Sequence, residues 1–150
     1  MKPPDWLKQS MAELTEARRH LNYSFEQVAA LPATLTDANE ANLESVEAFT
    51  SRFARCVDLL TNKVLRSLDE AELRTRGTLL DVINRAEQRG FVGRAADLRE
   101  MKEIRNMIAH DYAAEKAGEI FAYCREQKPI FDAICDRVKT YTDQVLAKYR

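Results

Sequence analysis

An uninterrupted apolar stripe in the middle of the chain constrains the fold more than any other feature of the sequence. The spacing of three and four residues that marks one face of an α-helix repeats without a gap at Leu43, Val46, Phe49, Phe53, Val57, Leu60, Val64 and Leu68. This pattern predicts one helix of about 32 residues, roughly 48 Å long at the standard rise per residue. A helix of that length must bury its stripe against several partner helices or against a second subunit.

Two capping patterns mark the expected helix starts in the first third of the chain. Asp5, which follows two prolines, is a typical N-cap, and apolar residues at helical spacing continue from there towards Pro32. Asp37 is followed three residues later by Glu40, and this pair resembles a capping box. We therefore expect a first helix capped by Asp5 and ended by Pro32, and a long helix that begins near Asp37.

Three further helices are expected after the long one. Residues 76–90 indicate a short helix closed by Gly90, and residues 95–110 form a fourth amphipathic pattern. A last helix continues towards the C-terminus, where Pro129 should kink or restart it. With only four glycines and four prolines and no alternating strand pattern, the sequence predicts an all-α, up-and-down bundle of about five helices in one domain, 1–150.

The charge balance limits the kinds of partner that the whole surface can attract. The formal net charge is −1 and the sequence pI about 6.2. A protein that coats nucleic acid without sequence preference is usually strongly basic, so a general field for polyanions is not expected. Any bound polyanion would have to be held by a local group of cations.

The cysteines and the apolar runs indicate the compartment. Cys56, Cys124 and Cys135 form no CxxC pair, and their odd number and long spacing favour reduced thiols in the core over a disulfide framework. The N-terminal residues lack the apolar core of a signal peptide, and no apolar run reaches membrane-spanning length. We expect a cytoplasmic protein without a membrane partner.

The segment RNMIAHDY, residues 105–112, is the stretch best suited to chemistry. On the fourth helix, Leu98, Met101, Ile104 and Ile108 form the core stripe. By the same helical arithmetic Asn106 and His110 share another face with Glu103, whereas Arg105 and His110 point about 140° apart. A site containing both groups therefore needs either a helix that ends near His110 or a second copy of the motif from a neighbouring chain.

Arginine and histidine in this pattern suit the cleavage of RNA, which carries its own nucleophile in the 2′-hydroxyl. Histidine has an ordinary pKa near 6.5 and can act as a base or an acid near neutral pH. Arginine stays charged and can bind two phosphate oxygens at once. Asn106, one turn before His110, could orient the imidazole or hold a phosphate oxygen, and Glu103 is a supporting candidate.

A plainer interpretation needs no active site. A histidine near the C-terminus of a helix commonly interacts with the helix dipole, and Arg105 would then be a surface cation that pairs with Asp111 or Glu103. In that case Tyr112 is a half-buried aromatic residue at the rim of the bundle. The chain contains only two histidines, no carboxylate cluster beside them and no phosphate-binding loop, so we expect neither a metal nor a cofactor.

The motif nevertheless resembles a known family. Arg-x4-His followed by x-Tyr, with Asn directly after the Arg and near the end of a late helix, is similar to the HEPN superfamily, and most of all to HepT-type toxins and the related nucleotidyltransferase substrate-binding proteins. The likeness extends over roughly residues 37–139. It implies a HEPN-like core in 37–150, preceded by an N-terminal helical extension in 1–35 that is longer than the minimal toxin has.

The resemblance also implies a function. Members of these families are dimers that bring two Arg-x4-His motifs into one cleft, and many cut RNA without a metal. Carried over, Arg105 and His110 would be catalytic, with Asn106 in support. Tyr112 would be the residue to which a small nucleotidyltransferase antitoxin attaches AMP, and RNA would be the substrate. Two alternatives remain: a noncatalytic subunit that docks a nucleotidyltransferase, and a purely structural helical dimer.

Overall fold

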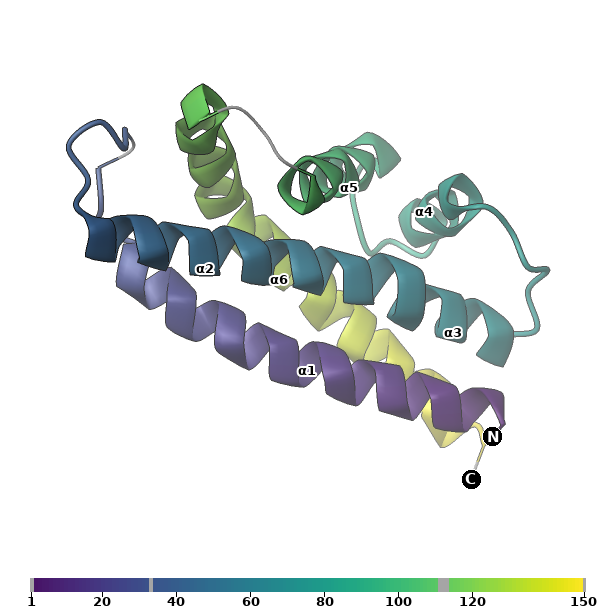
Figure 1. Ribbon diagram of the computed structural model, residues 1–150. Coiled ribbons are helices and arrows are strands. Elements are labelled where there is room, and N and C mark those ends of the chain that lie inside the picture. Colours follow the sequence, from purple (N-terminus) through teal and green to yellow (C-terminus); the bar gives the residue numbers. More distant parts are fainter. Residues whose placement is uncertain (1, 33, 111–113, 150) are drawn as a thin grey trace.

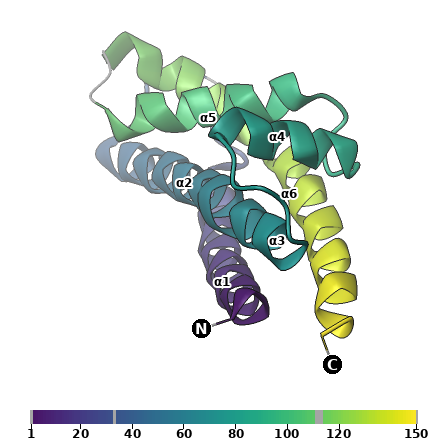
Figure 2. The same cartoon turned by 90° about the vertical axis from the view of Figure 1, so that its right-hand side faces the viewer.

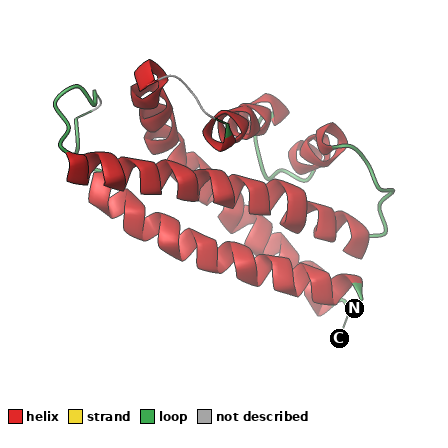
Figure 3. Cartoon of the chain, viewed as in Figure 1, coloured by secondary structure: helices red, strands yellow, loops and turns green. Residues whose placement is uncertain are grey.

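The computed structural model describes residues 2–32, 34–110 and 114–149, and that part of the chain contains helices and loops but no strand (Figure 3). This confirms the all-α expectation. In chain order the elements are α1 Pro3–Val28, α2 Glu40–Asp58, the π-helical segment η1 Leu59–Val64, α3 Leu65–Ala71, α4 Leu79–Gln88, α5 Ala95–Ala109, the short 3-10 helix η2 Ala114–Lys116, and α6 Ala117–Ala147.

The long helices form the body of the bundle. Figure 1 shows α1 and the continuous α2–η1–α3 helix lying side by side in opposite directions, with α6 behind them. Helices α4 and α5 lie across α2 instead of along it, since α5 is viewed nearly end-on in Figure 1 and lengthwise after the rotation in Figure 2. The predicted helical bundle is therefore present, but two of its shorter helices cross the others steeply.

Aromatic side chains fill the centre of the bundle. Phe49 of α2 meets Phe121 of α6 edge to face, with ring centroids 6.2 Å apart, and Phe53 meets Phe131 at 5.6 Å. Fully burying a side chain of this size contributes roughly 1.5–3 kcal/mol. Helix α1 closes the same core with the fully buried residues Leu7, Leu14 and Leu21.

The first helix begins earlier than its capping pattern predicts. Lys2 is the N-cap, α1 begins at Pro3, and Asp5 lies within the first turn. Proline suits the first helical position because the N–H that it lacks would have no helical partner there. Asp5 accepts a hydrogen bond from the backbone N of Lys2 (3.2 Å), so it still supports the helix start. The helix ends at Val28, before Pro32.

The start of the long helix is also shifted by two residues. Asn39, not Asp37, is the N-cap, and its Oδ1 accepts a hydrogen bond from the backbone N of Asn42 at 2.8 Å. The continuous helix then runs from Glu40 to Ala71. Its predicted length was right, while the capping pattern placed the start too early.

A π-helical segment interrupts this long helix at Leu59–Val64. The hydroxyl of Thr61 donates to the backbone O of Val57 at 2.8 Å, and Leu59, Leu60 and Thr61 are all buried in succession. A wider helical turn brings one extra residue to the same face, which explains three consecutive buried positions. The apolar spacing of the sequence did not indicate this segment.

A largely buried network of ion pairs and hydrogen bonds connects α4 with α3 and α6. The carboxylate of Asp69 in α3 lies 3.0 Å from Arg85 and 2.6 Å from Arg89 of α4 and its C-cap. Arg89 also pairs with Glu72 at 2.8 Å, and the phenol of Tyr141 in α6 donates to the same carboxylate at 2.8 Å. Four charged groups and one phenol thus join α3 and α4, which are consecutive, to the distant α6.

Helix α4 ends at a glycine and helix α6 continues past a proline, as the sequence indicates. Gly90, with φ 81°, follows the C-cap of α4, and Phe91 N donates back to Ala86 O at 3.0 Å. Helix α6 continues through Pro129 and changes direction along its length in Figure 1, in agreement with the expected kink. Among the described helices, none is long and apolar enough to cross a membrane.

Candidate functional site

Helix α5 holds the first part of the motif with its apolar face against α2. Leu98 and Met101 are fully buried, and Ile104 and Ile108 pack at the edge of the core. This confirms the predicted core stripe. Asn106 on α5 and His110, directly after it, are exposed.

Arg105 is partly buried and contacts α2. Its Nε lies 3.4 Å from Oδ1 of Asp58, and one terminal NH2 group donates to Oδ1 of Asn106 at 3.2 Å. Glu103, one of the two partners expected for Arg105, is exposed and makes no ion pair among the described residues. The other, Asp111, lies outside the described residues. A guanidinium has five N–H donors, so these two contacts leave donors that can bind an anion.

Three donor side chains contact the carboxylate of Asp58, which is the last residue of α2 before the π-helical segment. Besides Arg105, its Oδ1 accepts hydrogen bonds from Lys102 Nζ at 2.9 Å and from Asn62 Nδ2 at 2.7 Å. Burial raises the pKa of the Asp58 carboxyl, but the hydrogen bond and charge of Lys102, with Asn62 and Arg105, outweigh burial and lower that pKa below its ordinary value. The carboxylate is therefore negative at neutral pH and orients two cations of α5.

Sequence reasoning missed Asp58 and Lys102. One signal was present: Lys102 lies one turn after Leu98, at the edge of the apolar stripe, and a lysine that is buried there needs a partner. The identity of that partner was not predictable, because Asp58 is 44 residues away and belongs to another helix.

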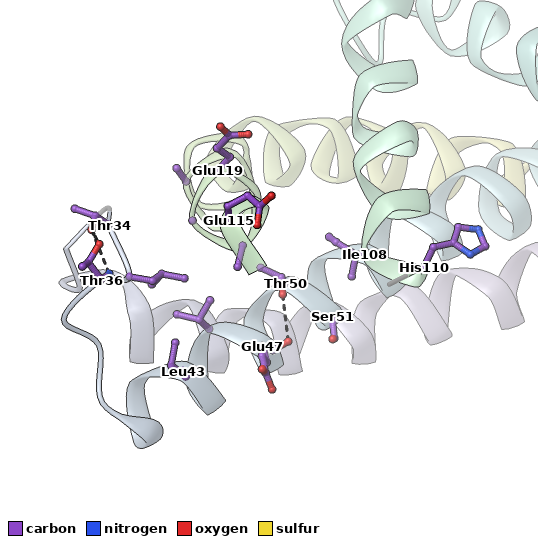
Figure 4. Close-up of a pocket in the computed structure, with 15 residues that line it drawn as sticks. Thr34, Thr36, Leu43, Glu47, Thr50, Ser51, Ile108, His110, Glu115 and Glu119 are labelled. Atoms are coloured by element: carbon purple, nitrogen blue, oxygen red, sulfur yellow. Dashed lines mark hydrogen bonds between the residues drawn. The ribbon is translucent and has the colours of Figure 1, made fainter. Parts of the chain in front are cut away.

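His110 is the first residue beyond α5. It is the C-cap, with φ −108° and ψ 155°, and its backbone N donates to Asn106 O at 3.2 Å. The helix therefore ends near His110, which is one of the two arrangements that the sequence left open. Figure 4 shows the ring of His110 pointing away from Ile108 and Thr50, and the residue is exposed.

An open groove adjoins His110. The groove has a volume of ≈ 1070 Å³ and lies between the first half of α2, the residues that precede it, the end of α5 and the start of α6 (Figure 4). Its lining includes the apolar residues Leu35, Leu43, Val46 and Ile108 and the acidic residues Glu47, Glu115 and Glu119. We call it the α2–α6 groove; His110 is one of its lining residues, and the His110 ring points away from Ile108 and Thr50.

Tyr112, the residue expected to be modified, lies outside the described residues. The cysteines and the possible metal ligands lie within them. The three cysteines are free and buried, which confirms their assignment to the core. Burial raises the pKa of the Cys56 and Cys124 thiols to about 12, so these groups are poor nucleophiles and poor metal ligands at neutral pH. The described part of the chain contains no group of three or more His, Cys, Asp or Glu that could hold a metal ion.

Comparison with known proteins adds no relative: no family model, no curated protein and no solved structure matches this chain. The motif and the geometry around it therefore remain the guides to the function of this chain.

Proposed function

We propose that this chain is a HEPN-type toxin of a toxin–antitoxin pair that cleaves RNA without a metal. The observation that carries the proposal is the different placement of the Arg105 and His110 side chains. Arg105 is held by Asp58 at the side of α5, whereas His110 is exposed at the first position beyond the helix. A fixed guanidinium suits a phosphate, and an exposed imidazole is free to exchange protons with solvent or substrate.

In the proposed reaction, the imidazole of His110 accepts the proton of the ribose 2′-hydroxyl. The 2′-oxygen then forms a bond to the adjacent phosphorus while the bond to the 5′-oxygen breaks. Arg105 stabilises the negative charge that develops on the phosphoryl oxygens, and Asp58 acts as a positioning residue for Arg105. The products are a 2′,3′-cyclic phosphate and a 5′-hydroxyl, so one group must also protonate the leaving oxygen.

That proton is proposed to come from His110 of a second copy of the chain. His20, the other histidine, is on α1 and pairs with Glu16 at 3.3 Å, so it belongs to a different helix from the motif. A symmetric dimer would bring two Arg105–His110 pairs to one cleft. Asn106 accepts a hydrogen bond from Arg105, and Glu103 is exposed on the same helix. Both are proposed as supporting residues of the site. The proposed setting is the cytoplasm.

Regulation at Tyr112 is proposed from the motif alone. Transfer of AMP to its phenol by a partner nucleotidyltransferase would place a phosphate near Arg105 and exclude RNA. Mass spectrometry of the chain co-expressed with a nucleotidyltransferase encoded beside it tests this step. An unmodified Tyr112 would contradict it.

The test of the main proposal is expression of the chain without any partner, followed by RNA cleavage with the purified protein. We expect growth arrest and cleavage with the wild type, and a loss of about 100-fold or more in cleavage rate for His110→Ala. His20→Ala is the matched control and should keep the wild-type rate. Equal activity of wild type and His110→Ala would contradict the proposal. Mixed dimers with one His110→Ala chain test the shared cleft, and full activity per dimer would rule it out.

A second candidate is a noncatalytic subunit that docks a nucleotidyltransferase and presents its substrate. The specific observation in its favour is the acidic lining of the α2–α6 groove beside His110, which does not suit RNA. Such a subunit should be harmless when expressed alone and should bind a nucleotidyltransferase or a nucleotide. Growth arrest by the wild type that His110→Ala relieves would exclude this candidate.

A further inference from the structure

The α2–α6 groove has a chemical character of its own. Val46 of its floor is buried, and Leu43 and Ile108 are partly exposed in it. An apolar floor of this kind gains free energy when a ligand removes it from water. The groove is open to solvent and is made by elements far apart in the sequence, which join only in the folded chain.

The charge of the rim restricts the ligand. Glu47 on α2, Glu115 in η2 and Glu119 at the start of α6 line the groove and are exposed. Only Glu119 has a cationic neighbour within ion-pair distance among the described residues, Lys116 at 3.6 Å. No lysine or arginine is found among the described lining residues. Ligands with phosphate groups would be repelled, and cationic ligands would be attracted.

The residue types that line the groove also disfavour the binding of nucleic acid. Single-stranded RNA is usually held by aromatic side chains that stack on bases and by cations along the backbone. The described residues of the groove provide neither, because its apolar surface is aliphatic. A protein segment with aliphatic residues on one face and lysine or arginine on its edges matches both the floor and the rim.

We infer that the α2–α6 groove is a docking site for a cationic amphipathic helix of a partner protein. Leucine-like side chains of this helix would cover Leu43, Val46 and Ile108, and its cations would pair with Glu47, Glu115 and Glu119. In helix-in-groove recognition, the apolar face of an amphipathic helix commonly lies in a hydrophobic groove. Because His110 is at the edge of the groove, a docked helix limits access to the motif from that side. The inference does not depend on RNA cleavage by the chain.

A synthetic helix tests the inference directly. The probe is a fluorescein-labelled peptide of about 18 residues, five helical turns, with leucine on one face and lysine on the other. Its fluorescence anisotropy is measured with the full chain at increasing protein concentration. We expect saturable binding that weakens about tenfold or more in the variant Glu47→Gln/Glu115→Gln/Glu119→Gln, and weakens with added salt. A peptide with glutamate in place of lysine should not bind.

Two further variants separate the groove from net charge and from folding. Glu26→Gln/Glu70→Gln/Glu100→Gln removes the same charge from exposed positions outside the groove and should bind like the wild type. Ser51→Trp fills the groove without a change of charge and should weaken binding as the acidic substitutions do. Circular dichroism checks that each variant keeps its helix content.

The inference is overturned if the lysine peptide binds all variants equally. It is also overturned if single-stranded RNA binds in the same assay and the groove variants weaken it, because the groove would then hold nucleic acid. A dimer that sedimentation detects in the wild type and that Ser51→Trp abolishes would assign the groove to a second copy of the chain and would likewise overturn it. Growth arrest in the previous experiment is scored separately, so either proposal can fail alone.

Discussion

Nζ of Lys102 lies 2.9 Å from Oδ1 of Asp58, and this contact joins α5 to α2 directly before the π-helical segment. The side chain of Lys102 is only 10% exposed. Since an ammonium group that has lost its water needs a partner, the carboxylate of Asp58 both stabilises the bundle and fixes the neighbouring Arg105.

Asp58→Asn is expected to lower the free energy of unfolding by about 1–3 kcal/mol at neutral pH, because Lys102 loses a charged hydrogen-bond partner. The pKa of Asp58 is lower in the folded chain than its ordinary value, so its contribution is complete above about pH 4 and is lost as the pH falls through the folded-state pKa. Urea unfolding of both proteins from neutral to acidic pH should show the difference shrink in acid. Asp143→Asn, which breaks an exposed pair with Lys139, should change little at any pH.

Removal of Arg89 should be far more damaging than removal of a surface arginine. Arg89 and Asp69 are about 5% and 6% exposed, and Arg89→Met leaves the carboxylates of Asp69 and Glu72 without their shared cation. We expect a loss of about 3–5 kcal/mol in unfolding free energy. Arg19→Met, in an exposed pair with Glu16, should cost less than about 1 kcal/mol. If Arg89→Met lowered the unfolding free energy as little as Arg19→Met does, the buried ion-pair network would not stabilise the fold.

Replacement of Leu73 by glycine should stabilise the chain. It has φ 58° and is 89% exposed at the end of α3, and a left-handed conformation is strained for any residue with a Cβ. Leu73→Gly is expected to raise the unfolding free energy by about 1 kcal/mol. Leu80→Gly, within the first turn of α4, should have the opposite sign. A lower urea midpoint for Leu73→Gly would contradict this account of the turn.

Two buried threonines should respond in opposite ways to valine. The hydroxyl of Thr142 is fully buried without a hydrogen-bond partner in the described structure, so Thr142→Val should stabilise by about 1 kcal/mol. The hydroxyl of Thr61 donates to Val57 O, and Thr61→Val should be neutral or destabilising. Thermal unfolding by circular dichroism compares the two variants.

The thiols should be unreactive while the chain is folded. Burial raises the pKa of Cys56 and Cys124 to about 12 and also raises the pKa of Cys135, so almost no thiolate is present at pH 8. Ellman's reagent should therefore modify these cysteines only as fast as the bundle opens. Rapid modification of the native protein would contradict the buried placement. In denaturant all three thiols should react at the ordinary rate.

Much of the fold was predictable because helix periodicity is a local property. The spacing of Leu98 and Met101 correctly placed the buried face of α5, and the long stripe predicted the length of the α2–η1–α3 helix. The helix starts were less predictable, since Asp37 and Asn39 are both good N-caps and the choice depends on where the preceding loop packs. The end of α5 at His110 was anticipated only as one of two possibilities.

The sequence by itself determined the helical class, the amphipathic faces and the candidate residues of the motif, because these depend on neighbours within one or two turns. Only the tertiary structure decided that Asp58 holds Arg105, that α4 and α5 cross α2, and that three acidic residues are among those that line a groove beside His110. Spacing along a helix determines which side of it a residue occupies. Which side chain lies opposite depends on the packing of helices far apart in the chain, and a single sequence contains no direct record of that packing.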